Sequence, residues 1–477
     1  MRHAAWLSLV VLSACNENLS HAQPPMDRFF YPGGVALTTV ASPSPAASGN
    51  QALLVVSANF DLHYDRQEGA TLLSVDPGLY DEATGSGSLG RTDGDLLKFG
   101  PGAQLGSYAG PVAVADAVTC PSQAGSPEAF VASRYTRKLY RFPIGAGGEV
   151  SPCTLGKLCQ FDLDPELLDP APVGLACRAD GRRKSLFVGY LRSPNIGTIG
   201  AGTAWLSEFD VDNLGAQPRT FALAPGPVSD MAYDAQADRL YAVGRFAGLT
   251  APLYILDLPA CSSADKDDAT APCPGPRLQT VDLFSALAGA ELVGIALSNP
   301  QPGLPRRAYI AVRTYDEGYA ISTRSRPPFD VGGALMVVDL DEDLVGQPLA
   351  RVRAVIPIGL GAGAVRVLPV RPGLADLVVV PSSGDGTISI YDDEAGAVVR
   401  VVSLDEASGA PEAGRTPYGT AVQDQGSEAL VYIASFRDWT VSVLRVSIAD
   451  PTSADLVRYP AGTSLQGKPV RIGRQQQ

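Results

Sequence analysis

The sequence predicts an all-β protein, a seven-bladed β-propeller whose blades are four-stranded antiparallel sheets. Three observations support this prediction. Short apolar runs recur in one order along the chain, turn-forming residues separate them (50 Gly and 39 Pro in 477 residues), and no amphipathic helical stretch is long enough to cover an open sheet. With 45% hydrophobic and 18% charged residues, the chain also has enough apolar surface to exclude extended disorder.

The last repeat shows the pattern most clearly. Its four short runs are Pro417–Val422, Ala429–Ala434, Thr440–Leu444 and Leu456–Tyr459, and the third alternates with a period of two. Polar residues and glycine separate the runs. Four short antiparallel strands joined by such turns make one propeller blade.

The same order can be followed back along the chain for seven cycles. We expect first strands to begin near Pro32, Pro111, Pro172, Pro227, Leu292, Ala364 and Pro417. The expected second strands are Leu53–Val56, Ala129–Ala132, Leu186–Val188, Leu240–Val243, Tyr309–Val312, Leu377–Val380 and Val431–Ala434. The fourth strand of the first blade is expected at Asp95–Phe99. The blades are longer than a compact repeat because the loops between their strands are long.

We expect the sheets to form a ring, because both faces of each sheet must be buried. Both faces of such a sheet are apolar, and stacking it between two neighbours buries both, while closure leaves no terminal blade exposed. We therefore assign residues 29–465 to one propeller and residues 466–477 to a polar C-terminal tail. A pair of β-sandwiches is the competing architecture.

The N-terminus predicts export. Residues 1–14 combine a positive start with an apolar stretch too short to span a bilayer, as in a signal peptide. The run Leu12-Ser-Ala-Cys15 resembles the lipobox of bacterial lipoproteins, which implies that Cys15 is lipidated and becomes the mature N-terminus. An ordinary secretory signal with an incidental cysteine is the alternative.

The resemblance to lipoproteins also implies a location. Asn16 is not the aspartate by which such proteins are retained in the inner membrane, so we expect an outer-membrane lipoprotein that faces the periplasm or the cell surface. Residues 15–28 would comprise the lipidated cysteine and a flexible polar tether. Lipid would be the only membrane anchor.

Six further cysteines agree with an oxidising compartment. Six cysteines allow fifteen pairings. Short loops favour Cys153–Cys159 and Cys261–Cys273, which leaves Cys120–Cys177 by elimination. A cysteine-rich metal site is the alternative, but no pair has the spacing of a zinc knuckle.

Composition argues against several functions. The formal charge of −13 does not suit nucleic-acid binding, and of three histidines only His63 lies in the body of the chain. We therefore expect no catalytic residues, no metal and no cofactor. The acidic run Asp339–Asp343 could suggest calcium, but aspartates at strand ends more often cap turns.

Residues that directly follow the second strands form the candidate binding site. In a propeller these positions open on one face, so arginines and aromatic side chains of several blades would meet at a common rim, a composition typical of binding hot spots. The candidates are Arg134, Tyr135, Tyr190, Arg245, Phe246, Arg313, Tyr315, Phe436 and Arg437. In the alternative interpretation, each arginine pairs with an aspartate of a neighbouring blade or stacks on an aromatic ring.

Two stretches carry a family resemblance, Leu377–Val399 and Pro417–Leu444. They are similar to the YVTN-repeat, lactonase-like β-propellers, whose repeat combines a Pro-x-Gly strand, a Tyr-Val-x-Asn strand and a Thr-Val-Ser-Val strand. The resemblance implies the propeller fold and export. It transfers no active site.

Together these features predict an envelope-anchored lipoprotein that acts as a non-catalytic binding or scaffolding propeller. Its expected partner is an envelope protein or an anionic ligand. The alternative is a lactonase-like or carbohydrate-active hydrolase that uses Asp, Glu and Arg on one propeller face, and a third possibility is a purely structural envelope protein.

Overall fold

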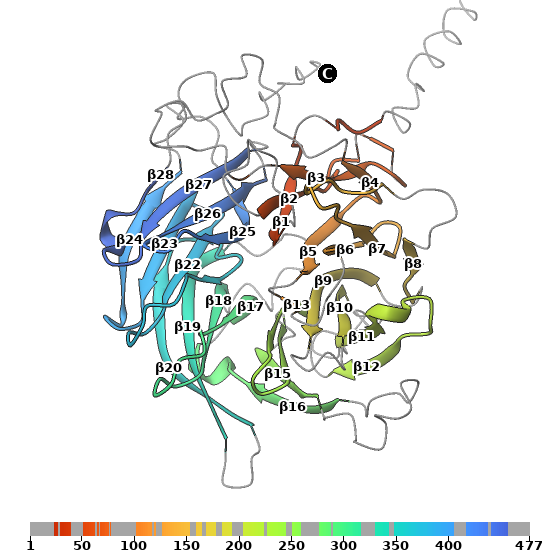
Figure 1. The fold of residues 1–477 in the computed structure, drawn as a ribbon. Helices are drawn as coiled ribbons and strands as arrows, with labels where there is room; N and C mark the ends of the chain where they lie inside the picture. Colours follow the sequence, from red (N-terminus) through yellow and green to blue (C-terminus); the bar gives the residue numbers. More distant parts are fainter. Residues whose placement is uncertain are drawn as a thin grey trace, which may run out of the picture.

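The computed structural model confirms the predicted seven-bladed β-propeller (Figure 1). It describes residues 23–456 except 27–28, 40–50, 63, 66, 76, 78–101, 117–118, 121–125, 153–158, 165–167, 178–183, 193–203, 224–226, 245–249, 259–275, 288–289, 316–329, 343–347, 405–415 and 437–439. Each of the seven sheets contains four strands that are consecutive in the chain, and every pair of neighbouring strands is antiparallel.

The first four blades occupy the N-terminal half of the ring. Blade 1 contains β1 (Pro32–Thr39), β2 (Gln51–Ser57), β3 (Ala70–Val75) and β4 (Ala103–Leu105). Blade 2 contains β5 (Ala109–Ala115), β6 (Glu128–Ser133), β7 (Lys138–Pro143) and β8 (Gln160–Asp162). Blade 3 contains β9 (Leu168–Cys177), β10 (Lys184–Arg192), β11 (Ala204–Asp210) and β12 (Arg219–Leu223). Blade 4 contains β13 (Val228–Asp234), β14 (Arg239–Gly244), β15 (Pro252–Asp257) and β16 (Arg277–Asp282).

The last three blades complete the ring. Blade 5 contains β17 (Ala290–Leu297), β18 (Arg307–Tyr315), β19 (Asp330–Glu342) and β20 (Pro348–Ile358). Blade 6 contains β21 (Arg366–Val367), β22 (Leu377–Ser382), β23 (Thr387–Asp392) and β24 (Ala397–Ser403). Blade 7 contains β25 (Pro417–Asp424), β26 (Glu428–Ser435), β27 (Thr440–Ser447) and β28 (Asp455–Leu456).

A few strand boundaries differ from the prediction. The fourth strand of blade 1 is β4, whereas the predicted segment Asp95–Phe99 lies outside the described residues. The last strand, β28, begins at Asp455, and residues 457–459 of the predicted segment lie outside the described residues, whereas the first strand of blade 6 is only two residues long. Outer and short strands have few apolar residues, so their sequences give a weaker signal than the second and third strands.

The alternation along the second strands explains how the blades pack. In β2, Leu53 and Val55 contact blade 7, whereas Leu54 and Val56 contact blade 2. Successive side chains of a strand point to opposite faces, so a continuous apolar run supplies both faces of a buried sheet. Seven such clusters fill the seven spaces between neighbouring blades. This arrangement excludes a pair of β-sandwiches.

The ring closes by packing between blade 7 and blade 1. Figure 1 shows the red strands of blade 1 beside the blue strands of blade 7. Leu53 and Leu73 pack with Tyr432 and Val443, and the Tyr432 hydroxyl lies 3.0 Å from the carbonyl oxygen of Pro77. Because each blade is built from its own consecutive strands, no strand is exchanged across this junction in the described part of the chain.

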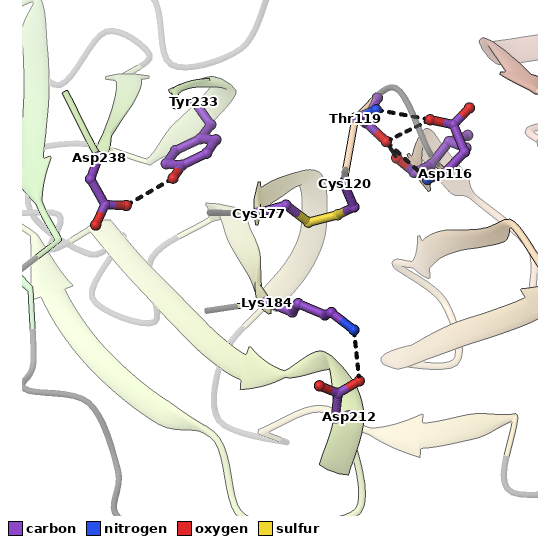
Figure 2. The surroundings of a disulfide bond; sticks show 9 residues. Asp116, Thr119, Cys120, Cys177, Lys184, Asp212, Tyr233 and Asp238 are labelled. Carbon is purple, nitrogen blue, oxygen red and sulfur yellow. Dashed lines mark hydrogen bonds and ion pairs between the residues drawn. A yellow bond between two sulfur atoms is a disulfide. The ribbon is translucent and has the colours of Figure 1, made fainter. Parts of the chain in front are cut away.

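A disulfide between Cys120 and Cys177 joins blade 2 to blade 3 (Figure 2). The Cα atoms are 5.1 Å apart, and both cysteines are buried in the core between these blades. This bond confirms the pairing predicted by elimination. Cys159 is also disulfide-bonded, whereas its predicted partner Cys153, and Cys261 and Cys273, lie outside the described residues.

A short turn positions Cys120. The backbone N–H of Cys120 donates to the carbonyl oxygen of Asp116 (2.7 Å), and the Asp116 carboxylate accepts from the N–H of Thr119 (2.9 Å). The same carboxylate accepts from the N–H of Thr39 in blade 1 (2.9 Å). Asp116 therefore links blades 1 and 2 beside the disulfide that joins blade 2 to blade 3.

The described helices are the short 3-10 turns η3 (Val211–Asn213), η5 (Phe284–Ala286) and η7 (Pro451–Ser453). In the part of the chain that the structure describes, no helix has the length and hydrophobicity needed to cross a membrane.

Candidate anion site at the mouth of the central channel

A cavity of about 90 Å³ lies on the axis of the ring. Its walls come from the first strands of blades 1, 2, 4, 5 and 7, from the residues around the first strand of blade 6, and from the ends of second strands. First strands begin where second strands end, so the cavity lies at one end of the channel, which we call the channel mouth. One water molecule needs about 10–15 Å³ of cavity volume, so there is room for a solvated polar group.

Three arginines line this cavity, Arg134, Arg313 and Arg366. Arg134 follows β6 directly, Arg313 lies near the end of β18, and Arg366 begins β21. Two of the predicted arginines, from blades 2 and 5, therefore do meet in one cavity. Arg366 was not predicted, because it belongs to a first strand.

The arginines differ in how their nitrogens are satisfied. Arg313 Nε donates to the carbonyl oxygen of Ala362 (2.8 Å), and Arg366 Nε donates to that of Thr420 (3.0 Å). Both bonds reach the next blade. Arg134 Nε is buried and has no hydrogen-bond partner among the described residues, and the guanidinium carbon lies 6.0 Å from the centre of the Phe60 ring. A buried donor without a partner is costly, because it has lost water and gained nothing in return.

Many arginines elsewhere in the described structure are paired with carboxylates. These pairs are Arg141–Glu128, Arg219–Glu208, Arg239–Asp257, Arg306–Asp234, Arg307–Asp339, Arg371–Asp392 and Arg445–Glu428. No described carboxylate forms an ion pair with Arg134, Arg313 or Arg366. The chain has 50 acidic residues for 37 basic ones, so three positive groups gathered without such a pair are a distinctive feature of this cavity.

One carboxyl group lies among the described lining residues, that of Asp230 in β13. Its oxygens accept from the backbone N–H groups of Met231 (2.9 Å) and Ile295 (3.0 Å). Burial raises the pKa of Asp230, and the positive charge of Arg366 opposes that rise. A charged residue within an inner strand was a sequence signal for both Asp230 and Arg366.

Five aromatic side chains form a continuous ridge beside Arg134. The aromatic ridge consists of Tyr31, Phe60, Tyr108, Tyr135 and Phe436. Neighbouring ring centres are 5.0 Å apart for Tyr31–Phe436, 4.7 Å for Phe60–Phe436, 5.2 Å for Phe60–Tyr108 and 6.3 Å for Tyr108–Tyr135. The ridge spans blades 7, 1 and 2, and Phe60 joins it to Arg134.

Two tyrosines of the ridge have an unusual backbone conformation. Tyr31 and Tyr108 occupy matching positions, each directly before the first strand of its blade, and their φ angles are +45° and +56°. The carbonyl of Tyr31 accepts from the N–H of Ala58 (3.1 Å), and that of Tyr108 accepts from the N–H of Arg134 (3.3 Å). Positive φ is uncommon for a non-glycine residue, and such strain is found most often at functional sites.

Not every predicted binding residue belongs to this surface. Arg134, Tyr135, Arg313 and Phe436 lie at the mouth or on the ridge. Tyr190 does not: its side chain is buried between blades 2 and 3, with the hydroxyl 3.0 Å from Ser207 Oγ. Arg245, Phe246, Arg437 and the side chain of Tyr315 lie outside the described part.

The length of β10 explains the position of Tyr190. The predicted second strand ends at Val188, whereas β10 continues to Arg192. Tyr190 therefore lies within the strand, where side chains two residues apart point to the same face. Its side chain follows those of Leu186 and Val188 into the core between blades 2 and 3 and does not reach the rim.

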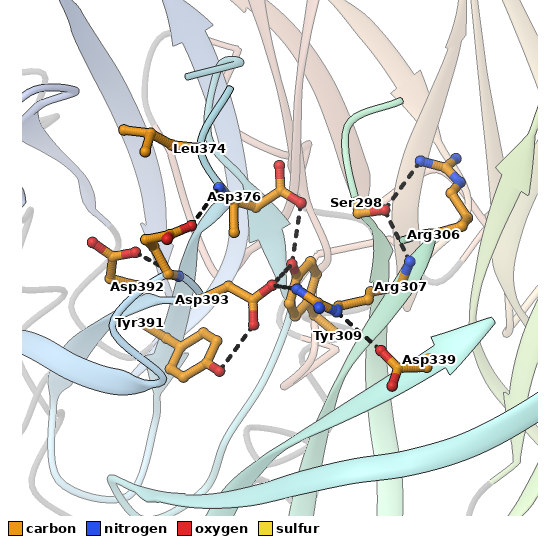
Figure 3. Close-up of polar contacts among 12 residues, drawn as sticks. Ser298, Arg306, Arg307, Tyr309, Asp339, Leu374, Asp376, Tyr391, Asp392 and Asp393 are labelled. Carbon is orange, nitrogen blue, oxygen red and sulfur yellow. Dashed lines mark hydrogen bonds and ion pairs between the residues drawn. The ribbon is translucent and has the colours of Figure 1, made fainter. Parts of the chain in front are cut away.

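A second polar cluster lies at the other end of blades 5 and 6 (Figure 3). The Tyr309 hydroxyl lies 3.1 Å from Asp376 Oδ2 and 2.9 Å from Asp393 Oδ2, and Arg307 pairs with both Asp393 and Asp339. Asp339, which belongs to the acidic run with a possible calcium role, is thus an ion-pair partner. Since the members of this cluster satisfy one another, it ties two blades together.

Among the described residues there is no group of three His, Cys, Asp or Glu side chains that could hold a metal ion. The chemistry that these residues offer at the channel mouth is that of guanidinium groups, one carboxyl group and aromatic rings.

No family model matches the sequence, and no significant match was found among curated proteins. Solved structures do resemble the fold. Hydrazine synthase of Kuenenia stuttgartiensis matches with a TM-score of 0.50 and 10% identity, over 88% of this chain and 97% of that one. At this identity, the similarity shows the β-propeller fold and nothing more.

Two lactonase-like propellers are also similar. The periplasmic gluconolactonase PpgL of Pseudomonas aeruginosa has a TM-score of 0.45 and 16% identity, over 77% of this chain and 84% of that one. A Bacteroides fragilis protein described as a putative 6-phosphogluconolactonase has a TM-score of 0.45 and 14% identity, over 79% of this chain and 83% of that one.

Proposed function

We propose that this chain is an exported, lipid-anchored propeller that binds a ligand or partner protein through an anionic group held at the channel mouth, without converting it chemically. The proposal places the chain among the YVTN-repeat, lactonase-like propellers, with Pro32-Gly-Gly34 and Pro417-Tyr-Gly419 as the starts of matching first strands. Cys15 would carry the lipid.

The observation that supports anion binding is the state of Arg134. Its buried Nε has no hydrogen-bond partner among the described residues, and it shares a cavity with two further arginines that no described carboxylate pairs with. A ligand carboxylate that binds the Arg134 guanidinium would neutralise the local charge. Arginine suits such a ligand because its planar fork of donors matches the two oxygens of a carboxylate.

The alternative function is hydrolysis, and Asp230 is the residue that favours it. A carboxyl group with a raised pKa in a cavity can act as a general acid. Glycosidases, however, commonly need two carboxyl groups on either side of the bond to be cleaved. Asp230 is the only carboxyl among the described lining residues, and both of its oxygens accept backbone hydrogen bonds. Binding is therefore the better-supported function.

Arg134→Gln tests anion binding. We expect the full-length protein in detergent to broaden the ¹⁹F NMR signal of trifluoroacetate, and Arg134→Gln to weaken this binding at least tenfold because it removes the charge and the fork of donors. Arg351→Gln removes an equal charge from the exposed outer strand β20 and serves as the matched control. Equal binding by both variants would disprove the anion site.

Cys15→Ser tests the anchor. We expect the wild-type protein to sediment with membranes and the variant to fail to do so, since the thiol that carries the lipid is gone. Intact-mass measurement of the membrane form should show an acylated N-terminal cysteine. Membrane association that survives the substitution would contradict lipidation at this residue. Asn16→Asp keeps the cysteine and should instead move the protein to the inner membrane.

A further inference from the structure

We propose that the anionic group recognised at the channel mouth is joined to a ring, and that the aromatic ridge is the part of the site that binds this ring. The inference rests on the proposed anion binding and specifies the ligand further, as a carboxylate attached to a ring with an apolar face. Aromatic acids and sugar acids share this chemistry.

The first reason is the distribution of exposed aromatic side chains. Phe60, Tyr135 and Tyr418 are 39%, 36% and 43% exposed, and they are the only strongly exposed aromatic residues among those described. All three lie at the channel mouth, because Tyr418 lines the cavity and the other two belong to the ridge. The exposed apolar residues of the outer strands, such as Leu278, Leu349 and Val401, are all aliphatic.

The second reason is that the ridge is continuous with the anion site. Arg134 lies over the Phe60 ring, and Phe60 contacts both Phe436 and Tyr108. A ligand whose carboxylate reaches the Arg134 fork therefore has its next atoms beside Phe60. A separation of 6.0 Å between guanidinium and ring fits a carboxylate bonded to a ring directly or through one carbon.

The third reason is the geometry that holds the ridge in place. Neighbouring rings meet at interplanar angles of 47° to 85°, so they support one another and present both faces and edges to solvent. Tyr31 and Tyr108 keep positive φ angles at matching positions of two blades. The surrounding fold must overcome this strain, which is expected where rings are pre-organised for binding.

Displacement of trifluoroacetate by four competitors tests the inference with the wild-type protein. Phenylacetate supplies an aromatic ring, glucuronate a sugar ring, acetate no ring, and benzyl alcohol a ring without charge. We expect at least one ring-bearing acid to compete about tenfold more strongly than acetate, and benzyl alcohol not to compete. The ring-bearing acid that competes more strongly, phenylacetate or glucuronate, identifies the type of ring.

Variants of the aromatic ridge then show which residues give the ring-bearing acid its advantage over acetate. Phe60→Ala and Tyr135→Ala should each reduce the advantage of the ring-bearing acid over acetate, measured as the ratio of the two competition constants, because any change in Arg134, which lies over Phe60, affects both acids alike. Leu278→Ala, which removes an equally exposed apolar side chain from β16, should have no effect. The two ridge variants are independent, so a folding defect in one leaves the other as the test.

The outcomes separate the two proposals. If all carboxylates compete equally and the ridge variants behave like wild type, the ring inference is wrong, whereas anion binding stands. If no carboxylate binds, or if Arg134→Gln has no effect, the proposed function is wrong, and the ring inference falls with it.

Discussion

At the scale of single residues, two aspartates of blade 6 show how burial and ion pairing shift the pKa of a carboxyl group in opposite directions. Burial would raise the pKa of Asp392, but the hydrogen bond and charge of Arg371 hold that pKa below its ordinary value. For Asp376, burial prevails over the hydrogen bonds from Asn299 and Tyr309, and the pKa is raised. The two carboxyls should therefore give stability opposite dependences on pH.

Asp376→Asn should flatten the fall of stability with rising pH. A folded-state pKa above the unfolded value, about 3.9, means that the contribution of Asp376 is present below this pH and is lost as the pH rises through the folded pKa. An amide cannot lose a proton in this way. The free energy of unfolding, measured in urea between pH 4 and pH 7, should therefore fall less for the variant than for wild type.

Asp392→Asn provides the matched control with the opposite sign. The contribution of Asp392 is present above the unfolded pKa and is lost as the pH falls through the folded value. The variant leaves buried Arg371 without its ion-pair partner, which should cost about 3–5 kcal/mol at neutral pH. This deficit should shrink as the pH is lowered towards 3. A deficit that stays constant would contradict the assigned pairing.

At the scale of elements, glycines set the distance between the first strands of neighbouring blades. A Cβ added to Gly34 would lie 3.0 Å from Gly110 O of blade 2, and one added to Gly294 would lie 2.5 Å from Gly363 O of blade 6. A Cβ on Gly419 would lie 3.3 Å from Gly33 O of blade 1. The glycine of the Pro-x-Gly motif is thus required by close approach of two backbones at the channel wall.

Gly294→Ala should therefore destabilise the protein by about 1–3 kcal/mol, the usual cost of overpacking. The atom that the new methyl group meets belongs to the backbone and cannot rotate away. Gly33→Ala is the control, because its Cβ would meet its nearest neighbour, Ala58 Cβ, at an ordinary 3.7 Å. Thermal unfolding of the two variants measures the difference. Equal melting temperatures would disprove the close-approach explanation.

The fold could be predicted from the sequence because the second and third strands of each repeat are clear apolar runs. Runs such as Leu53–Val56 are apolar on both faces, and only stacking in a ring satisfies both. The site could be predicted only in part. Arg134 and Arg313 follow from strand ends, whereas Tyr190 lies inside β10, which is longer than the predicted strand. The positions of Asp230 and Arg366 in the cavity could not be predicted, because the expected strand lengths do not determine which inner-strand residues face the axis.

At the scale of the whole molecule, closure of the ring depends on side-chain packing between the first and last blades. Tyr432 is central to this junction, because it is fully buried and its hydroxyl lies near both Pro77 O of blade 1 and Gln423 Oε1 of blade 7, at 3.0 and 2.7 Å. Tyr190 makes a comparable contact, but its hydroxyl bonds to Ser207 of its own blade. The two tyrosines therefore separate closure from general stability.

Tyr432→Phe and Tyr190→Phe should each lower the free energy of unfolding by about 1 kcal/mol, the typical net value of one hydrogen bond. Their local effects should differ. In Tyr432→Phe, amide hydrogen exchange should become faster in β1 and β25, because the junction opens more readily, whereas in Tyr190→Phe these strands should exchange as in wild type. If both variants leave exchange in β1 and β25 unchanged, the Tyr432 hydroxyl does not hold the ring closed, and apolar packing alone accounts for closure.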